Sequence, residues 1–366
     1  MKSGTAPEST RSSQNHDTAY ALNYHESTKH SEISLRTSGH YLDWANKPSQ
    51  FKIYEDLTSV SLPKNFPQPE AEPLMAISGR VGQMEPPNLG LTELAELLFF
   101  SAGLTRKYRF GGELHYMRAA SATGALYPIE LYVVAGDVTG LEAGLYHFDP
   151  LGFQLSRIRK GDYRVELASV SDDGIALAPA TIAFTSLAWK NAWKYEARSY
   201  RHWFWDGGVI AANLISLSAS MGSPTRIVQG FVDQTVNELL GLKDEGEATI
   251  YLSPVGPQGH RSTDHQLKRI DSILPRVQHL SEEETKYAGI WEAHRASFLQ
   301  SKEEIERWAK VRLETSNSQR TTYPKIPLPP PLRLRSLRGL ERSFSDEAQH
   351  EGSPAHPSHS PSYQQC

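Results

Sequence analysis

The chain has 366 residues, of which 39% are hydrophobic, so it can bury the core of one large domain or of two ordinary ones. Its 38 Lys and Arg residues against 42 Asp and Glu residues give a net charge of −4 without a basic run, which excludes a protein that tracks a nucleic-acid backbone. The single cysteine, Cys366, excludes a disulfide framework and a thiolate metal site within one chain, so we expect no metal and a reducing, cytoplasmic location.

The amino-terminal part of the chain predicts two segments outside the main domain. Residues 1–20 are polar and lack the apolar core of a signal peptide, and we expect a disordered arm there. Residues 21–88 are first aromatic and charged and then rich in proline, which predicts an extension lying against a folded body. No later stretch has eighteen uncharged apolar residues, so we expect neither export nor a membrane partner.

The main domain is expected over residues 89–260, and it begins with a helix. Three leucines lie at helical spacing between Thr92, which can cap a helix, and Gly103, which can end it, so we expect a helix over 92–102. Strand patterns follow at Ile129–Ala135, Gly144–Phe148, Phe153–Ile158 and Ala180–Leu187. The turn Asp149-Pro150-Leu151-Gly152 joins the second and third of these strands into a predicted hairpin.

The second half of this domain mixes helices and strands. Apolar spacing predicts two helices, over 190–204 and 207–221. A short helix capped by Asp233 and closed by Gly241 comes next, before a last strand at Ala248–Val255. Because strands and helices mix without strict βαβ alternation, the pattern predicts an α+β layer fold.

The carboxyl-terminal part is expected to contain helices and then a tail. Residues 261–314 include two capping boxes, Ser281-x-x-Glu284 and Ser301-x-x-Glu304, which predict where two packing helices begin. Residues 315–366 are rich first in proline and later in serine, a composition typical of an unfolded tail.

The stretch Arg118–Pro128, which reads R-A-A-S-A-T-G-A-L-Y-P, contains residue types suited to a flat ligand with a phosphate. Arg118 offers a fork of donors, Ser121 adds a hydroxyl, and Gly124 lets the backbone come close to a ring. The same residues also fit a loop that turns before the strand at 129–135, so residue types alone leave both interpretations open. The P-loop, the dinucleotide-binding glycine motif and the serine nucleophile elbow are absent from the sequence.

Several motifs, in order, resemble the SagB/ThcOx branch of the nitroreductase family. The resemblance rests on R-A-A-S-A-T-G-A-L-Y-P-I-E-L-Y-V-V-A at 118–135, on Trp193-Lys194-Tyr195 with Arg198-Ser199-Tyr200-Arg201, and on Gly230-Phe231-Val232-Asp233. Tyr24-His25-Glu26-Ser27-Thr28-Lys29-His30 resembles the extension found ahead of such domains. Together these motifs span about residues 24–260.

The resemblance implies an α+β sandwich with a central, mostly antiparallel sheet flanked by helices, which dimerises with FMN at the subunit interface. Biosynthetic members of this branch take a hydride from a thiazoline or oxazoline ring, so the implied substrate is a small heterocycle or a modified peptide that carries one. Side chains cannot accept a hydride, and such a reaction therefore needs a cofactor. The implied FMN-binding residues are Arg80, Arg118, Ser121, Ala122, Gly124, Ala125, Gln229 and Gly230.

Lys194 and Tyr195 match the adjacent Lys-Tyr pair that the azole-forming members use in catalysis. A phenol becomes a useful base only when its pKa falls below about 10, and a nearby ammonium group would lower it. The alternative is an interfacial helix rich in Trp and Tyr, with Lys194 reaching water.

Two features depart from the family pattern. The R-x-S-x-R phosphate clamp with which such domains commonly open is replaced by Gly79-Arg80-Val81-Gly82-Gln83, which keeps one arginine. Residues 326–344 resemble the lead-in to a second domain of the same type, so pairing with a second similar domain is an alternative to a homodimer. Two other functions also stay open: a general nitro or quinone reductase that uses NAD(P)H, and a flavin-free domain that binds a partner.

Overall fold

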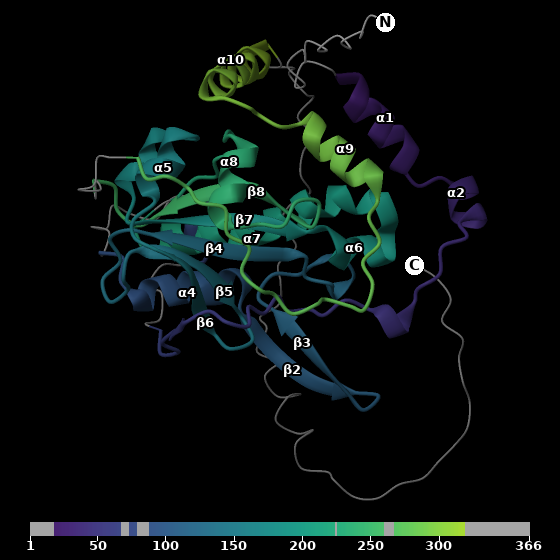
Figure 1. Cartoon of the computed structure of the whole chain (residues 1–366), viewed down its shortest axis with the longest axis horizontal. Helices are drawn as coiled ribbons and strands as arrows, with labels where there is room; N and C mark the ends of the chain where they lie inside the picture. The colour runs from purple at the N-terminus through teal and green to yellow at the C-terminus, as the bar shows by residue number, and fades with distance from the viewer. Residues whose placement is uncertain (1–17, 67–72, 79–87, 224, 260–266, 319–366) are drawn as a thin grey trace, which may run out of the picture. The chain divides into compact units, whose positions relative to one another are not determined.

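The computed structural model describes residues 18–66, 73–78, 88–223, 225–259 and 267–318. Its centre is a six-stranded sheet in the order β1-β6-β5-β4-β7-β8, in which every neighbouring pair is antiparallel (Figure 1). The strands are β1 (Ser59–Ser61), β4 (Ile129–Ala135), β5 (Gly144–Asp149), β6 (Gln154–Lys160), β7 (Ala180–Leu187) and β8 (Glu247–Val255). The predicted α+β fold with a central antiparallel sheet is confirmed.

The two central strands, β4 and β7, are buried along their whole length. Alternate residues of β4 point to opposite faces of the sheet, so Leu131 and Val133 join one core cluster while Tyr132 and Val134 join another. Both predicted central strands are confirmed, and β5 pairs with β6 as the predicted hairpin.

Helices cover both faces of the sheet (Figure 1). They include α4 (Leu91–Ala102), α5 (Arg164–Ser169), η4 (Asp173–Leu177), α6 (Ala188–Tyr195), α7 (Tyr200–Ser220) and α8 (Asp233–Leu240). Helices α4 and α7 contact each other and bury their apolar sides with Leu131, whereas α5 and α8 pack on the face with Tyr132. The predicted first helix is confirmed, although Gly90 begins it and not Thr92, with the Glu93 carboxylate accepting from the Gly90 N–H.

The predicted break between two helices near residue 205 is wrong. Helix α6 ends at Tyr195 and is followed by the single turn η5 (Glu196–Ser199). Helix α7 then runs without a break to Ser220. Glu196 has φ +50°, a left-handed conformation that an α-helix cannot continue. Gly207 lies inside α7, close to β8, where an added Cβ would lie 2.6 Å from Ile250 Cδ1.

The amino-terminal extension packs on the main body through its first helix. Its helices are α1 (Thr18–Thr28), α2 (Glu32–Thr37), η2 (Trp44–Asn46) and α3 (Pro73–Ile77). Arg198 and Arg201 donate to the carbonyls of Thr28 and His25 at the carboxyl end of α1, where cations oppose the negative end of the helix dipole. Residues 18–20, which were predicted to be disordered, are therefore helical, and the remainder of the predicted arm, 1–17, lies outside the described residues.

The carboxyl-terminal helices are α9 (Ala288–Ala296), which lies beside α1 in Figure 1, and α10 (Lys302–Ser318). The first predicted capping box is wrong, because no helix begins at Ser281, whose Oγ instead accepts from Trp189 Nε1 at 2.6 Å. The helix start predicted by the second box is confirmed, since Ser301 Oγ accepts from the Glu304 N–H at 3.3 Å where α10 begins, but the Glu304 carboxylate accepts from the Gln300 N–H at 2.7 Å and not from that of Ser301. Most of the predicted tail, residues 319–366, lies outside the described part of the chain.

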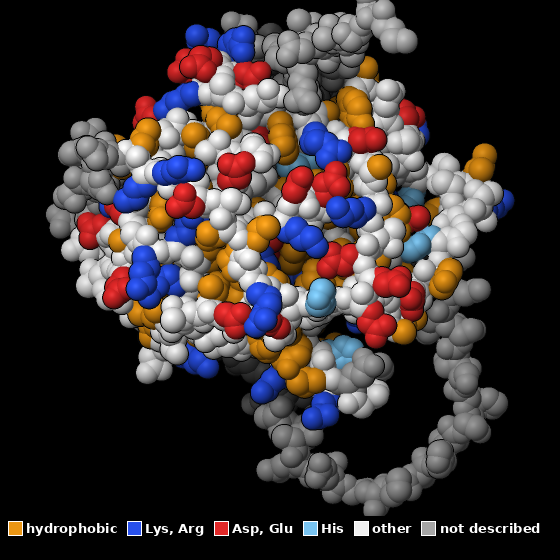
Figure 2. Space-filling model, in the orientation of Figure 1, with side chains coloured by type: hydrophobic (Ala, Val, Ile, Leu, Met, Phe, Trp, Pro, Cys, Tyr) orange, Lys and Arg blue, Asp and Glu red, His pale blue; other side chains and the backbone are white. Residues whose placement is uncertain are grey.

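A separate two-stranded hairpin, β2 (Leu104–Phe110) and β3 (Glu113–Arg118), projects from the body in Figure 1 and was not predicted. Figure 2 shows Lys and Arg side chains interspersed with Asp and Glu on this face of the molecule. Among the described residues, no helix combines the length and the apolar character that a membrane span requires. The described residues up to Thr315 form one compact unit, and of the second unit, 316–366, only the end of α10 is described.

Candidate functional site

The stretch Arg118–Pro128 forms a loop between β3 and β4 whose backbone is strained. It contains the single turn η3 (Thr123–Ala125), and Gly124, Ala125 and Tyr127 have φ values of +66°, +53° and +50°. Each non-glycine residue in this left-handed region costs about 1–3 kcal/mol, and such residues gather at binding and catalytic sites. The backbone geometry therefore marks the loop as a candidate site, a choice that residue types alone left open.

Asp206 of α7 holds the first half of the loop. Its Oδ1 accepts from the Thr123 N–H at 2.9 Å and from the Thr123 hydroxyl at 2.7 Å, while Oδ2 accepts from Asn191 Nδ2 at 3.3 Å. Burial raises the pKa of Asp206, although the hydrogen bonds from Thr123 and Asn191 act in the opposite direction. Sequence reasoning missed this role because Thr123 lies 83 residues from Asp206.

Tyr195, the last residue of α6, lies directly on the loop. A Cβ added at Gly124 would lie 2.8 Å from Tyr195 Oη, so the hydroxyl group sits against the glycine backbone. Lys194 Nζ lies 5.5 Å from the centroid of the Tyr195 ring, and the His202 ring meets that ring edge-on at 4.5 Å between centroids. The structure thus brings the predicted pair, Lys194 and Tyr195, to the predicted loop.

The protonation of Tyr195 differs from the sequence expectation. Burial raises the pKa of Tyr195, and the nearby Asp206 carboxylate raises it further. The expected lowering by the Lys194 ammonium group is therefore wrong for this chain, because burial and the Asp206 carboxylate both shift the pKa upward. At neutral pH the phenol keeps its proton and can donate a hydrogen bond.

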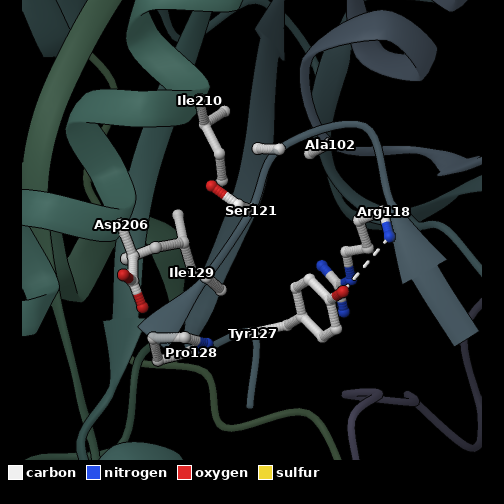
Figure 3. Close-up of a pocket in the computed structure, with 10 residues that line it drawn as sticks. Ala102, Arg118, Ser121, Tyr127, Pro128, Ile129, Asp206 and Ile210 are labelled. Carbon is white, nitrogen blue, oxygen red and sulfur yellow. Dashed lines mark hydrogen bonds between the residues drawn. The ribbon is translucent and has the colours of Figure 1, made fainter. Parts of the chain in front are cut away.

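A hollow lies beside the loop (Figure 3). Its lining includes Arg118, Ser121, Ala122, Ile129, Asp206 and Ile210. It encloses about 220 Å³ of empty space, part of which is open to solvent. Most small-molecule sites enclose about 300–1,000 Å³, so this hollow is smaller than a typical site of that kind.

Arg118 borders this hollow from a buried position between two aromatic rings. Its Cζ lies 5.1 Å from the Tyr127 ring centroid and 5.7 Å from that of Phe51. Its Nη2 donates to the Gln50 carbonyl at 2.7 Å, whereas its Nε has no hydrogen-bond partner in the described part of the chain. Burial lowers the pKa of Arg118. Part of the guanidinium fork is therefore already engaged, and the phosphate-binding role stays a prediction.

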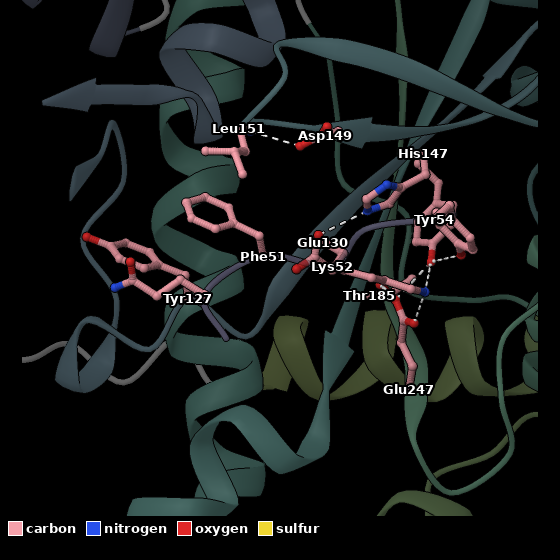
Figure 4. Close-up of polar contacts among 12 residues, drawn as sticks. Phe51, Lys52, Tyr54, Tyr127, Glu130, His147, Asp149, Leu151, Thr185 and Glu247 are labelled. Atoms are coloured by element: carbon pink, nitrogen blue, oxygen red, sulfur yellow. Dashed lines mark hydrogen bonds and ion pairs between the residues drawn. The ribbon is translucent and has the colours of Figure 1, made fainter. Parts of the chain in front are cut away.

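A buried polar network continues from Arg118 (Figure 4). Glu130 of β4 accepts from Lys190 Nζ at 2.7 Å, and its other oxygen lies 3.0 Å from His147 Nε2. Burial alone would raise the pKa of Glu130, but the charge of Lys190 and the hydrogen bond from His147 outweigh it and lower the pKa to about 2. This network fixes β4 at the point where the loop ends.

A second buried ion pair joins the extension to the sheet. Lys52 Nζ lies 2.5 Å from Glu247 of β8 and 2.6 Å from the Tyr132 hydroxyl, and Glu247 also accepts from the Thr185 hydroxyl (Figure 4). Burial alone would lower the pKa of Lys52, but Glu247 raises it above its usual value. A buried charge requires such a partner.

Gln229 and Gly230 lie away from the loop within one chain. A Cβ at Gly230 would lie 2.9 Å from Ile305 and 3.4 Å from Trp308, both on α10. The flanking Val228 and Phe231 belong to the core cluster of α5 and α8, on the opposite face of the sheet from the core residues of the loop. Their predicted place beside a flavin ring stays a prediction.

Two other features complete the account of candidate residues. Arg80, the remaining arginine of the expected phosphate clamp, lies outside the described residues. Within the described ranges, no group of three or more His, Cys, Asp and Glu residues is arranged to hold a metal ion.

Comparison with known proteins identifies relatives of this domain. The Nitroreductase family model matches residues 91–257. The nitroreductase-like protein MJ1384 of Methanocaldococcus jannaschii is 30% identical over 170 residues, which cover 46% of this chain and 81% of that protein. The trifolitoxin-processing protein TfxB of Rhizobium leguminosarum bv. trifolii is 33% identical over 153 residues, which cover 37% of this chain and 39% of that protein.

A solved structure with a nitroreductase-like fold is similar to this chain. A nitroreductase-like protein from Anabaena variabilis superposes with a TM-score of 0.58 at 25% identity, over 77% of this chain and 55% of that one. The chain therefore spans most of the archaeal relative but only about half or less of the other two. On the family match, and on a relative matched over four fifths of its length, this chain belongs to the nitroreductase family.

Proposed function

We propose that this chain binds FMN and acts as an oxidoreductase of the SagB/ThcOx type, which takes a hydride from a thiazoline-like or oxazoline-like ring. The observation that supports this most directly is the Tyr195 hydroxyl lying against Gly124. Two motifs that resemble this branch, distant in the sequence, meet at one loop with a strained backbone. The name of TfxB, a processing protein, agrees with a ring borne by a modified peptide.

The residues of the loop fit the proposed cofactor. Ser121, Gly124 and Ala125 are exposed and Ala122 is half-buried, so a hydroxyl and open backbone are available to a flat ring. The buried Arg118 Nε lacks a partner among the described residues and borders the same hollow, where an acceptor on the ligand would satisfy it. FMN bound there would supply the hydride acceptor that no side chain provides.

Oxidation of the substrate ring removes a proton as well as a hydride, and we assign Lys194 and Tyr195 roles in removing this proton. Because burial raises the pKa of Tyr195, the phenol keeps its own proton at neutral pH, and we assign it the role of donating a hydrogen bond that orients the substrate. Lys194 Nζ lies 5.5 Å from the centroid of the same ring, and we assign its neutral amine form, reached when the ammonium group releases a proton to solvent, the role of proton acceptor.

A second subunit is proposed to complete the site through α7. Its exposed positions form an apolar stripe at helical spacing, made of Trp205, Gly208, Val209, Ala212 and Ile215. Trp205 is 53% exposed, and a contiguous exposed apolar face favours a protein interface. Asp206 and Ile210 line the hollow from the same helix, so a homodimer formed there would enlarge it. A second similar domain could occupy the same stripe.

The test is to reconstitute the purified chain with FMN and to follow bound-flavin absorbance and oxidation of a thiazoline-bearing substrate. We expect Lys194→Ala and Tyr195→Phe to keep the flavin and to lose roughly 10²–10⁴-fold in turnover. Lys160→Ala and Tyr41→Phe alter exposed residues outside the site and serve as matched controls. Wild-type turnover in both site variants would overturn the assigned roles.

A general nitro or quinone reductase is the second candidate, favoured by the nitroreductase-like relative matched over 81% of its length. In that case NAD(P)H should bleach the bound FMN anaerobically, and a nitro or quinone acceptor should restore it without any need for Lys194. A chain that takes up no FMN at all would instead support the flavin-free binding domain.

A further inference from the structure

The proposed extension, residues 21–88, reaches the loop of the proposed flavin domain, 89–260, through Gln50. The Gln50 side chain donates from Nε2 to the Ala125 carbonyl at 2.9 Å. Its backbone carbonyl accepts from Arg118 Nη2 at 2.7 Å and from Lys190 Nζ at 3.0 Å. One residue of the extension therefore contacts both ends of the loop and the helix that leads to Tyr195.

These contacts fall where the loop is most strained. Gln50 holds the carbonyl of Ala125, which has φ +53°, and Lys190 holds the carbonyl of Tyr127, which has φ +50°, at 3.2 Å. Left-handed residues with side chains persist only where their surroundings hold them. The Ala125 carbonyl accepts a hydrogen bond from the Gln50 side chain. The Tyr127 carbonyl accepts one from Lys190, which also donates to the Gln50 carbonyl.

The segment that contains Gln50 is itself fixed in place. Phe51 lies against the Arg118 guanidinium group and meets the Tyr116 ring edge-on at 5.1 Å between centroids. Lys52 is anchored by its buried ion pair with Glu247. The segment that carries Gln50 is therefore anchored on one side of the loop, while Asp206 fastens Thr123 on the other.

We infer that Gln50 is a positioning residue of the site, which keeps the Arg118–Tyr127 loop in the shape that binds flavin. It acts through Ala125, Arg118 and Lys190. The inference rests on the proposed function, because the ligand that the loop would receive is the same FMN. Its consequence is that the extension forms part of the active site, although it lies outside the region that matches the family model.

The experiment compares the full chain with Gln50→Ala and Gln50→Glu, since a carboxylate at this position cannot donate to the Ala125 carbonyl. Asn46→Ala is the matched control, because Asn46 lies in the same segment and its Nδ2 donates at 2.9 Å to a carbonyl outside the site, that of Glu283. FMN affinity, the visible absorption spectrum of bound FMN, and hydrogen exchange at the amides of residues 123–127 without flavin are measured for each protein.

Both Gln50 variants are expected to bind FMN roughly three- to tenfold more weakly, the ratio that corresponds to one net hydrogen bond. They should also shift the flavin spectrum and speed loop exchange by a similar factor, while Asn46→Ala leaves all three unchanged. Wild-type affinity and spectrum in Gln50→Ala would overturn the inference, as would an equal loss in Asn46→Ala. If even the wild-type chain took up no FMN, the proposed function would fail, whereas unchanged loop exchange would overturn the role of Gln50 by itself.

Discussion

The loop Arg118–Pro128 and the segment Gln229–Gly230 are held by different kinds of contact. Polar groups from three parts of the chain fasten the loop: the Asp206 carboxylate, the Gln50 amide and the Lys190 ammonium group. Apolar side chains of α10 cover Gly230 instead. The contacts within one chain thus fix the shape of the loop, whereas those around Gly230 are the contacts of a packed core.

The largest expected effect comes from charging the α7 stripe, through which we propose that a second subunit completes the site. Trp205→Arg and Val209→Arg should convert a dimer to a monomer, because two cations would face each other at a buried apolar contact. Light scattering with size exclusion measures the state, and FMN binding should fall with it. The control is Gln234→Arg, at an exposed position of α8. An intact dimer in both variants would argue against this interface.

Next in size is the removal of the α7 anchor of the loop. Asp206→Ala leaves two donors of Thr123 without their acceptor, and we expect a loss of roughly 2–3 kcal/mol in the free energy of unfolding, measured with urea. Asp206→Asn keeps an acceptor oxygen and should lose less. Equal stability of the alanine variant and the wild type would show that the loop does not depend on Asp206.

A smaller effect is expected for Gly124→Ala. The substitution forces a side chain into a backbone with φ +66° and pushes against Tyr195 Oη, so stability should fall by about 1–2 kcal/mol and turnover should fall as well. Gly39→Ala is the control, since a Cβ there meets nothing within 4 Å. Thermal unfolding and substrate oxidation report the two effects, and normal turnover with reduced stability would separate Tyr195 from catalysis.

The last prediction concerns the region around Gly230. Asp233 accepts from the Leu299 N–H there and fastens the chain that leads to α10. Burial raises the pKa of Asp233 from 3.8 to about 7, so between these values the folded state binds a proton that the unfolded state has released. The stability from this proton is complete below about pH 4 and is lost as pH rises through 7. From pH 5 to 8 the Tm should fall by roughly 5 °C more in the wild type than in Asp233→Asn. Parallel pH profiles would contradict the assignment.

Much of the fold follows from local patterns, and the errors in its prediction come from contacts and backbone conformations that local patterns do not encode. The strands at 129–135 and 180–187 were predictable because long apolar runs have few places other than the centre of a sheet. The two helices predicted over 190–204 and 207–221 were divided at the wrong place, because α7 is continuous there and the actual break is at Glu196, whose positive φ no local residue pattern predicts.

The residues of the candidate site also divide into those that the sequence could predict and those that it could not. Lys194, Tyr195 and Gly124 were recognisable through motifs, and the structure places the Tyr195 hydroxyl against Gly124 with Lys194 Nζ 5.5 Å from the centroid of the Tyr195 ring. Asp206 and Gln50 were not recognisable, because each acts through a hydrogen bond to a loop far away in the sequence. The raised pKa of Tyr195 was also out of reach, since it depends on burial that only packing creates.

The ion pair between Lys52 and Glu247 shows that the region matched by the family model and the unit that folds have different boundaries. The region recognised by similarity, residues 91–257, contains Glu247 but not Lys52. A protein trimmed to that region would keep a carboxylate in its core without the ammonium group that neutralises it, and removing one partner of a buried pair costs about 3–5 kcal/mol. The limits of family resemblance are therefore not the limits of the unit that folds.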